Sequence, residues 1–131
     1  MVLVGDVSGK GLKAAMLVSV CVGILRNVES SSPAQILAAL NRGLVGHTGG
    51  GFVTCCCARF DADGTVTIAN AGHPSPYVDG REVEAESAQR ELFGFDRTRE
   101  ISTRSAQEIA EAAKAWGQND DITVVTVRRN A

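Results

Sequence analysis

The chain opens, after Met1, with Val2-Leu3-Val4-Gly5-Asp6-Val7-Ser8-Gly9-Lys10-Gly11, an apolar run that stops at a carboxylate and then turns through glycines. We expect a buried strand that ends near Val4, and then a sharp turn into a helix over residues 11–28. A carboxylate at the mouth of a buried strand is costly unless something cationic meets it. Asp6 is therefore the first candidate functional residue.

A second carboxylate stands in a similar position at the far end of the chain. Asn119-Asp120-Asp121 directly precedes the apolar run 122–127, which is predicted to be the last strand. Mg²⁺ and Mn²⁺ prefer oxygen ligands, and the chain offers no His or Cys cluster for zinc. We interpret Asp6 and Asp120 as ligands of a divalent-cation site. The residues alone leave an alternative open, in which Asp6 caps the following helix and Asp120 belongs to an Asx turn.

Composition narrows the class of protein. With 131 residues, 44% of them hydrophobic and 21% charged, the chain is expected to form one globular domain over residues 1–131. No apolar stretch approaches the roughly 20 residues of a membrane-spanning helix, and no secretory signal is recognisable, so a cytoplasmic location is expected. The net charge of −2, with scattered basic residues, argues against nucleic acid as a partner.

Four cysteines are present, one at Cys21 and three in the run Cys55-Cys56-Cys57. Adjacent strand residues point to opposite faces, so three consecutive cysteines cannot converge on one metal ion. We interpret the four as small buried hydrophobic residues in a reducing compartment.

The remaining pattern predicts helices grouped apart from strands, which is typical of an α+β layered domain. A second helix is expected over 33–44, with Ser32 as its N-cap and an apolar stripe at Ile36, Leu37, Leu40 and Leu44. Residues 52–60 and 65–71 are expected to form a hairpin, and residues 77–83 a tight turn with two short arms. A capping box, Ser105 with Glu108, predicts a further helix.

The Gly9-Lys10 pair also invites comparison with a phosphate-binding loop. That loop needs a glycine four intervening residues before the Gly-Lys pair and Ser or Thr after it, and the chain has Val4 and Gly11 there. A nucleotide-binding protein therefore stays a weak alternative.

Four ordered segments carry a resemblance to a known family. They are Gly5-Asp6-Val7-Ser8-Gly9-Lys10-Gly11, Asn70-Ala71-Gly72-His73-Pro74, Glu91-Leu92-Phe93-Gly94-Phe95-Asp96 and Asp120-Asp121-Ile122-Thr123-Val124-Val125. Together they resemble the metal-dependent serine/threonine phosphatase superfamily (type 2C), in its bacterial branch of stage II sporulation protein E and the sigma-factor regulators. The resemblance spans nearly the whole chain.

The resemblance implies a layered antiparallel β-sandwich flanked by helix pairs, with a centre of two Mn²⁺ or Mg²⁺ ions at one end. Asp6 would bridge both ions, Val7 would lend its backbone carbonyl, and Asp120 would be a further ligand. Asp121 would then be a supporting or turn residue. His73 matches a characteristic family position, to which we assign no catalytic step.

Two departures from the family pattern are visible. An upstream strand with an acidic segment is absent before Met1, so we expect an N-terminus that is trimmed relative to the family. The stretch between the second and third motifs is short and lacks a Thr/Ser-Asp-Gly turn that supplies another ligand. Asp79 is a substitute of poorer spacing, because Asp79-Gly80 fits an ordinary turn.

The implied activity is hydrolysis of phosphoserine or phosphothreonine on a regulatory protein of the anti-anti-sigma type, in a partner-switching pathway. Helices 12–28 and 33–44 would contact an upstream sensory domain or a second copy, although packing against the sheet explains their apolar residues equally well. A different class stays open: a catalytically impaired relative that serves as a module for protein binding or dimerisation.

Overall fold

The computed structural model describes residues 1–78, 81–83, 106–116, 123, 125 and 127. These residues divide into two compact units, which are described separately. The first unit contains β1 (Val2–Val7), α1 (Leu12–Asn27), α2 (Pro33–Leu44), β2 (Val53–Phe60) and β3 (Val66–Ala71). The second contains β4 (Tyr77–Val78), β5 (Arg81–Glu82) and α3 (Ala106–Trp116). No helix among the described residues is both long and apolar enough to span a bilayer.

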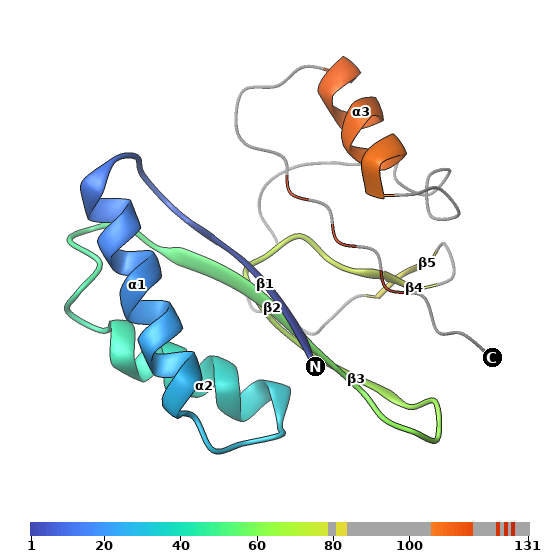
Figure 1. Ribbon diagram of the computed structural model, residues 1–131, viewed down its shortest axis with the longest axis horizontal. Coiled ribbons are helices and arrows are strands. Elements are labelled where there is room, and N and C mark those ends of the chain that lie inside the picture. The colour runs from blue at the N-terminus through green and yellow to red at the C-terminus, as the bar shows by residue number, and fades with distance from the viewer. Residues whose placement is uncertain (79–80, 84–105, 117–122, 124, 126, 128–131) are drawn as a thin grey trace. The chain divides into compact units, whose positions relative to one another are not determined.

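The first unit is built on an antiparallel sheet in which β2 lies between β1 and β3 (Figure 1). β2 and β3 form the predicted hairpin, closed by a turn in which the Asp61 amide donates to the Thr65 carbonyl at 2.9 Å. Gly64 in this turn has a φ of 94°, a conformation that glycine adopts without steric cost. β1 pairs with the other edge of β2, so the chain crosses from its first strand through both helices before it completes the sheet.

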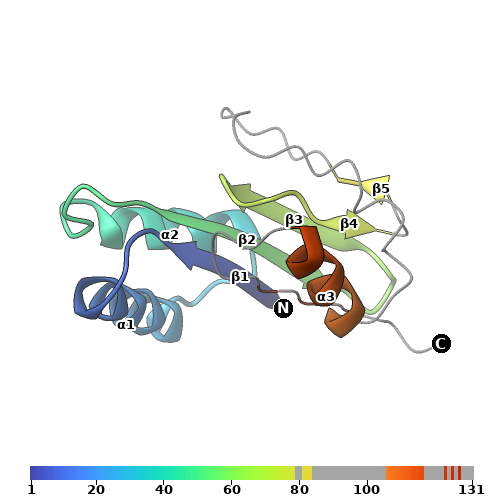
Figure 2. The same cartoon turned by 90° about the horizontal axis from the view of Figure 1, so that it is seen from above.

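Both helices of this unit pack on one face of the sheet, where they share a single core (Figure 2). The apolar stripe predicted for the second helix is confirmed, because Ile36, Leu37, Leu40 and Leu44 are all buried. Cys55 and Cys57 meet this stripe from β2, and Cys21, Ile24 and Leu25 meet it from α1. The interpretation as buried hydrophobic residues is confirmed for Cys55 and Cys57 but not for Cys21 and Cys56, which are only partly buried. Within the described residues all four cysteines are free thiols.

α1 is covered along one side only in the first unit. Leu17 is its single buried residue, whereas Leu12, Met16, Val18, Val20 and Val22 are exposed. Apolar residues surround this helix, a pattern that is typical of helices covered on more than one side. A helix that rests on one neighbouring helix and one sheet has an outer half that these elements cannot reach.

The first strand is longer than predicted. It continues through Asp6 to Val7, because pairing with β2 extends to Val53, whereas we expected it to end near Val4. The residue in the N-cap position of α1 is Gly11, without a side-chain capping bond, so the interpretation of Asp6 as a helix cap is wrong. Asp6 is also exposed, and it therefore does not bear the burial cost that we expected at the mouth of a buried strand.

The second unit contains the predicted turn with two short arms, in which Tyr77 pairs with Glu82 and Val78 with Arg81. The helix signalled by the capping box is present as α3, although Ser105 lies outside the described residues. Of the last predicted strand, the structure describes Thr123, Val125 and Val127, which are exposed and belong to no strand. The α+β class is confirmed and is compatible with a phosphatase-like fold, whereas the two-sheet sandwich stays a prediction.

Candidate metal and phosphate site

Asp6 lies on the face of the sheet that points away from the helices. Strand residues alternate between faces, and Leu3 of β1 packs into the helix-covered core, so Asp6 projects to the other side. Its partner across β2 is Thr54, which precedes the buried Cys55 and therefore shares the face of Asp6. Within the described residues no hydrogen bond or ion pair occupies the Asp6 carboxylate, which leaves its oxygens available to a ligand.

A histidine stands beside this pair. The Thr54 hydroxyl lies 3.0 Å from His73 Nδ1, so that the strand holds one edge of the imidazole ring. Asn70 fixes the backbone of the same residue, because its Oδ1 accepts from the His73 amide at 2.9 Å and its Nδ2 donates to the His73 carbonyl at 2.8 Å. Gly72 makes this tight loop possible with a φ of 68°. The ring of His73 is thus held from β2, and its backbone is held from the end of β3.

The electrostatic surroundings of His73 favour its neutral form. Burial of the half-covered ring lowers its pKa, because a charged imidazolium loses hydration there, while the negative charge of Asp6 acts in the opposite direction. The Asp6 carboxylate is therefore close enough to act on the imidazole through space. Asp6, Thr54, Asn70 and His73 form one polar group, which we call the Asp6–His73 cluster.

The backbone next to Asp6 offers a second kind of oxygen ligand. The Ser8 amide donates to the Phe52 carbonyl at 3.0 Å, and the Phe52 amide donates to Ser8 Oγ at 2.8 Å. In an antiparallel pair, hydrogen-bonded and non-hydrogen-bonded residue pairs alternate, so Val7, one step before Ser8, directs its carbonyl away from β2. β1 is an edge strand of the described sheet, so no described strand pairs with this carbonyl.

These donors suit a hard divalent cation, but they do not complete a site. Within the described ranges no group of three or more His, Cys, Asp or Glu side chains could hold a metal ion. The other predicted ligand, Asp120, lies outside the described residues, as do Asp121 and Asp79. The structure thus places Asp6 and Val7 next to each other at the end of β1, and their role as ligands together with Asp120 stays a prediction.

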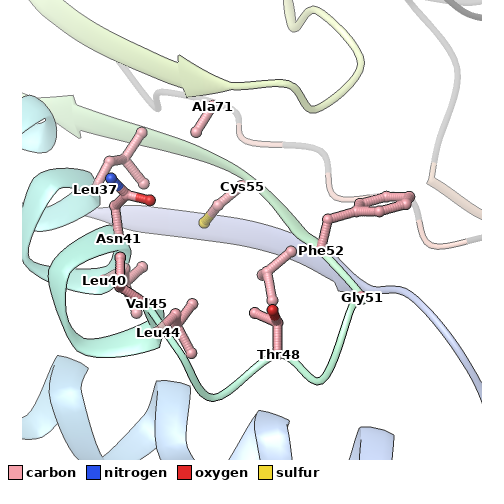
Figure 3. A pocket seen from close by; sticks show the side chains of 11 residues that line it. Leu37, Leu40, Asn41, Leu44, Val45, Thr48, Gly51, Phe52, Cys55 and Ala71 are labelled. Carbon is pink, nitrogen blue, oxygen red and sulfur yellow. The ribbon is translucent and has the colours of Figure 1, made fainter.

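A hollow of about 340 Å³ on the opposite face of the sheet is a poor alternative site (Figure 3). It lies between α2 and β2, and leucine side chains and the Cys55 thiol line much of its wall. Burial raises the pKa of that thiol to about 12, so it stays protonated and supplies no anionic ligand at neutral pH. Phosphate and metal chemistry therefore points to the Asp6–His73 cluster.

Comparison with known families identifies the family of the chain. Residues 1–107 match the family model of Stage II sporulation protein E. The chain belongs to this family. The family is one of serine/threonine phosphatases, and its members generally use Mn²⁺ or Mg²⁺. A phosphatase-related function with a general link to sporulation and sigma-factor regulation follows for this family member. No curated protein and no solved structure matches the chain.

Sequence reasoning did not find the roles of Thr54 and Asn70. The sequence nevertheless indicated the face on which Thr54 lies, because side chains alternate along β2 and Thr54 is next to the core residue Cys55. Asn70 precedes His73 by three residues with an intervening glycine, which is a spacing that suits a side chain that closes a loop on its own backbone.

Proposed function

We propose that this chain is a metal-dependent phosphatase that removes phosphate from serine or threonine of a regulatory protein. Membership of a phosphatase family, together with an exposed and unbonded Asp6 carboxylate, is the observation that supports this function best. The proposed substrate is a phosphorylated protein of the anti-anti-sigma type in a partner-switching pathway. Both the substrate and the pathway are carried over from the family resemblance.

In this proposal Asp6, the Val7 carbonyl and Asp120 hold two Mn²⁺ or Mg²⁺ ions. The chemistry that such a bound pair supplies is a water of lowered pKa and positive charge beside the phosphoryl oxygens. The contribution of the chain is to fix the ligands. Pairing of Asp6 with Thr54 in a regular ladder holds the carboxylate on a rigid strand, and rigid placement is what a catalytic centre requires.

Hydrolysis of a phosphoserine peptide in the presence of Mn²⁺ tests this function. We expect phosphate release by the full chain, dependence on Mn²⁺, and a loss of roughly 100-fold or more in Asp6→Asn, since removal of one charge-stabilising group commonly has that effect. Asp63→Asn is the matched control. Asp63 is an exposed turn residue whose Oδ1 accepts from the Thr65 amide at 2.8 Å, a bond that asparagine can keep.

A second measurement separates the enzyme from a catalytically impaired binding module. Mn²⁺ should raise the melting temperature of the wild type and of Asp63→Asn, because a ligand that binds only the folded state stabilises it. In Asp6→Asn the rise should be largely lost. Protein that neither hydrolyses the peptide nor responds to Mn²⁺ would overturn the enzymatic function and favour the module.

A further inference from the structure

The role of His73 is the question that the Asp6–His73 cluster leaves open. Its Nδ1 is engaged by Thr54, so Nε2, on the opposite edge of the ring, is the remaining polar atom of the side chain. Nε2 has no bonding partner among the described residues, and no buried side-chain nitrogen or oxygen there lacks one. Nε2 is therefore accessible to solvent or to a ligand.

The hydrogen-bonding arrangement decides what kind of ligand Nε2 can take. In the neutral imidazole one nitrogen donates and the other accepts. When the Thr54 hydroxyl donates to Nδ1, Nε2 carries the hydrogen and becomes a donor. A donor near a carboxylate that holds a cation suits an oxyanion, because the oxyanion can contact the cation and accept a hydrogen bond from His73 at the same time.

We propose that His73 binds a phosphoryl oxygen of the substrate through Nε2–H, and that Thr54 and Asn70 are the residues that position it. This inference rests on the proposed phosphatase function and adds a substrate-binding residue to it. Asn70 fixes the backbone by two bonds, and the contact between Thr54 and Nδ1 fixes the ring orientation. In the proposed arrangement the Thr54 hydroxyl donates to Nδ1, which leaves the hydrogen on Nε2.

Nitrogen NMR of the two histidines, with inorganic phosphate as the probe and Mg²⁺ present, tests the proposal without turnover. His47 is the internal control, because it is exposed and lies in the segment between α2 and β2. At constant pH and ionic strength, phosphate should shift the Nε2 signal of His73 saturably and leave His47 unchanged. Equal shifts of both histidines, or no shift of His73, would overturn the proposal.

Kinetics of variants provides the second test. Loss of a hydrogen bond to a charged group corresponds to roughly a tenfold or greater loss of affinity, so His73→Phe, which keeps a ring but has no donor, should raise KM by about that factor. Thr54→Val should raise KM in the same direction, and Thr54→Ser, which keeps the hydroxyl, should restore it. If Thr54 acted only by filling space, the isosteric Thr54→Val would instead keep the wild-type KM.

The two proposals fail in different ways. Turnover of the phosphopeptide with an unresponsive His73 signal, or with unchanged KM in His73→Phe, overturns the binding role and leaves the phosphatase intact. A phosphate-dependent shift of His73 without any Mn²⁺-dependent turnover overturns the phosphatase.

Discussion

Asp6 lies directly opposite Thr54 in the antiparallel pairing of β1 with β2. Side chains in such a pair lie close together, so the hydroxyl that holds His73 and the carboxylate that we propose as a metal ligand share one site on the sheet. The relationship depends on register, because a slip of one residue would move Asp6 to the face covered by the helices. Features that fix this register should therefore affect both stability and activity.

Gly5 is the first such feature. A Cβ atom at this position would lie 2.8 Å from the Thr54 carbonyl oxygen, a backbone atom that cannot easily move. We expect Gly5→Ala to lower the free energy of unfolding by about 1–3 kcal/mol through overpacking, as measured by urea denaturation. Gly23→Ala in α1, where nothing lies within 4 Å, should instead stabilise by about 0.5–1 kcal/mol. A Gly5→Ala protein as stable as the wild type would contradict the close approach of the strands.

Arg59 should contribute to stability at the other end of the sheet. Its guanidinium bonds Asp61 at 3.1 Å, and it also donates to the Ser31 carbonyl at 3.1 Å in the segment between α1 and α2. Arg59→Met keeps the apolar stem and should lose only about 1 kcal/mol, because the group is partly exposed. Lys13→Met at an exposed position of α1 is the control. Equal denaturation midpoints for the two variants would show that the Arg59 bonds contribute nothing.

The pKa of His73 predicts that the free energy of unfolding depends on pH in metal-free protein, which is prepared with a chelator. Because burial holds this pKa below its ordinary value of 6.5, the unfolded state binds more protons than the folded state in this range. The stabilisation from neutral His73 is fully present above pH 6.5 and is lost as the pH falls through 6.5 toward the folded pKa. His73→Gln should reduce this dependence, because glutamine does not titrate in this range.

Asp6 should modulate the same titration. Its negative charge raises the pKa of His73 against the effect of burial, so Asp6→Asn should lower that pKa further. NMR titration of the chelator-treated protein measures the change. An unchanged or raised His73 pKa in the variant would contradict the placement of the carboxylate beside the ring.

The thiols of the core should resist modification in the folded protein. Cys57 is fully buried, and burial raises the pKa of Cys55 to about 12, so neither presents a reactive thiolate. With iodoacetamide at pH 8, we expect mass spectrometry to find both residues unmodified until denaturant is added. Rapid labelling of Cys55 in native protein would mean that the helices do not cover this face of the sheet.

Much of the fold was predictable because its signals are local. The stripe of α2, the Asp61–Gly64 turn and the two arms around residues 79–80 each follow from spacing or turn chemistry within a few residues. The end of β1 was not predictable in this way, since it depends on where Val53 pairs across the sheet. The hydrogen bond between Thr54 and His73 was not predictable from local patterns either, because it joins residues 19 positions apart. Sequence patterns readily indicate which residues lie on the same face of a helix or strand. They indicate less readily which strands pair with each other.

β2 carries two functions in alternate residues. Cys55 and Cys57 face the helices, and Thr54 between Val53 and Cys55 faces the proposed chemistry. Neighbouring positions of this strand therefore answer to different physical demands, one to side-chain volume and the next to hydrogen-bonding capacity. Within these eight residues, a change at a helix-facing position should alter thermal tolerance, whereas a change at Thr54 should alter the proposed catalysis.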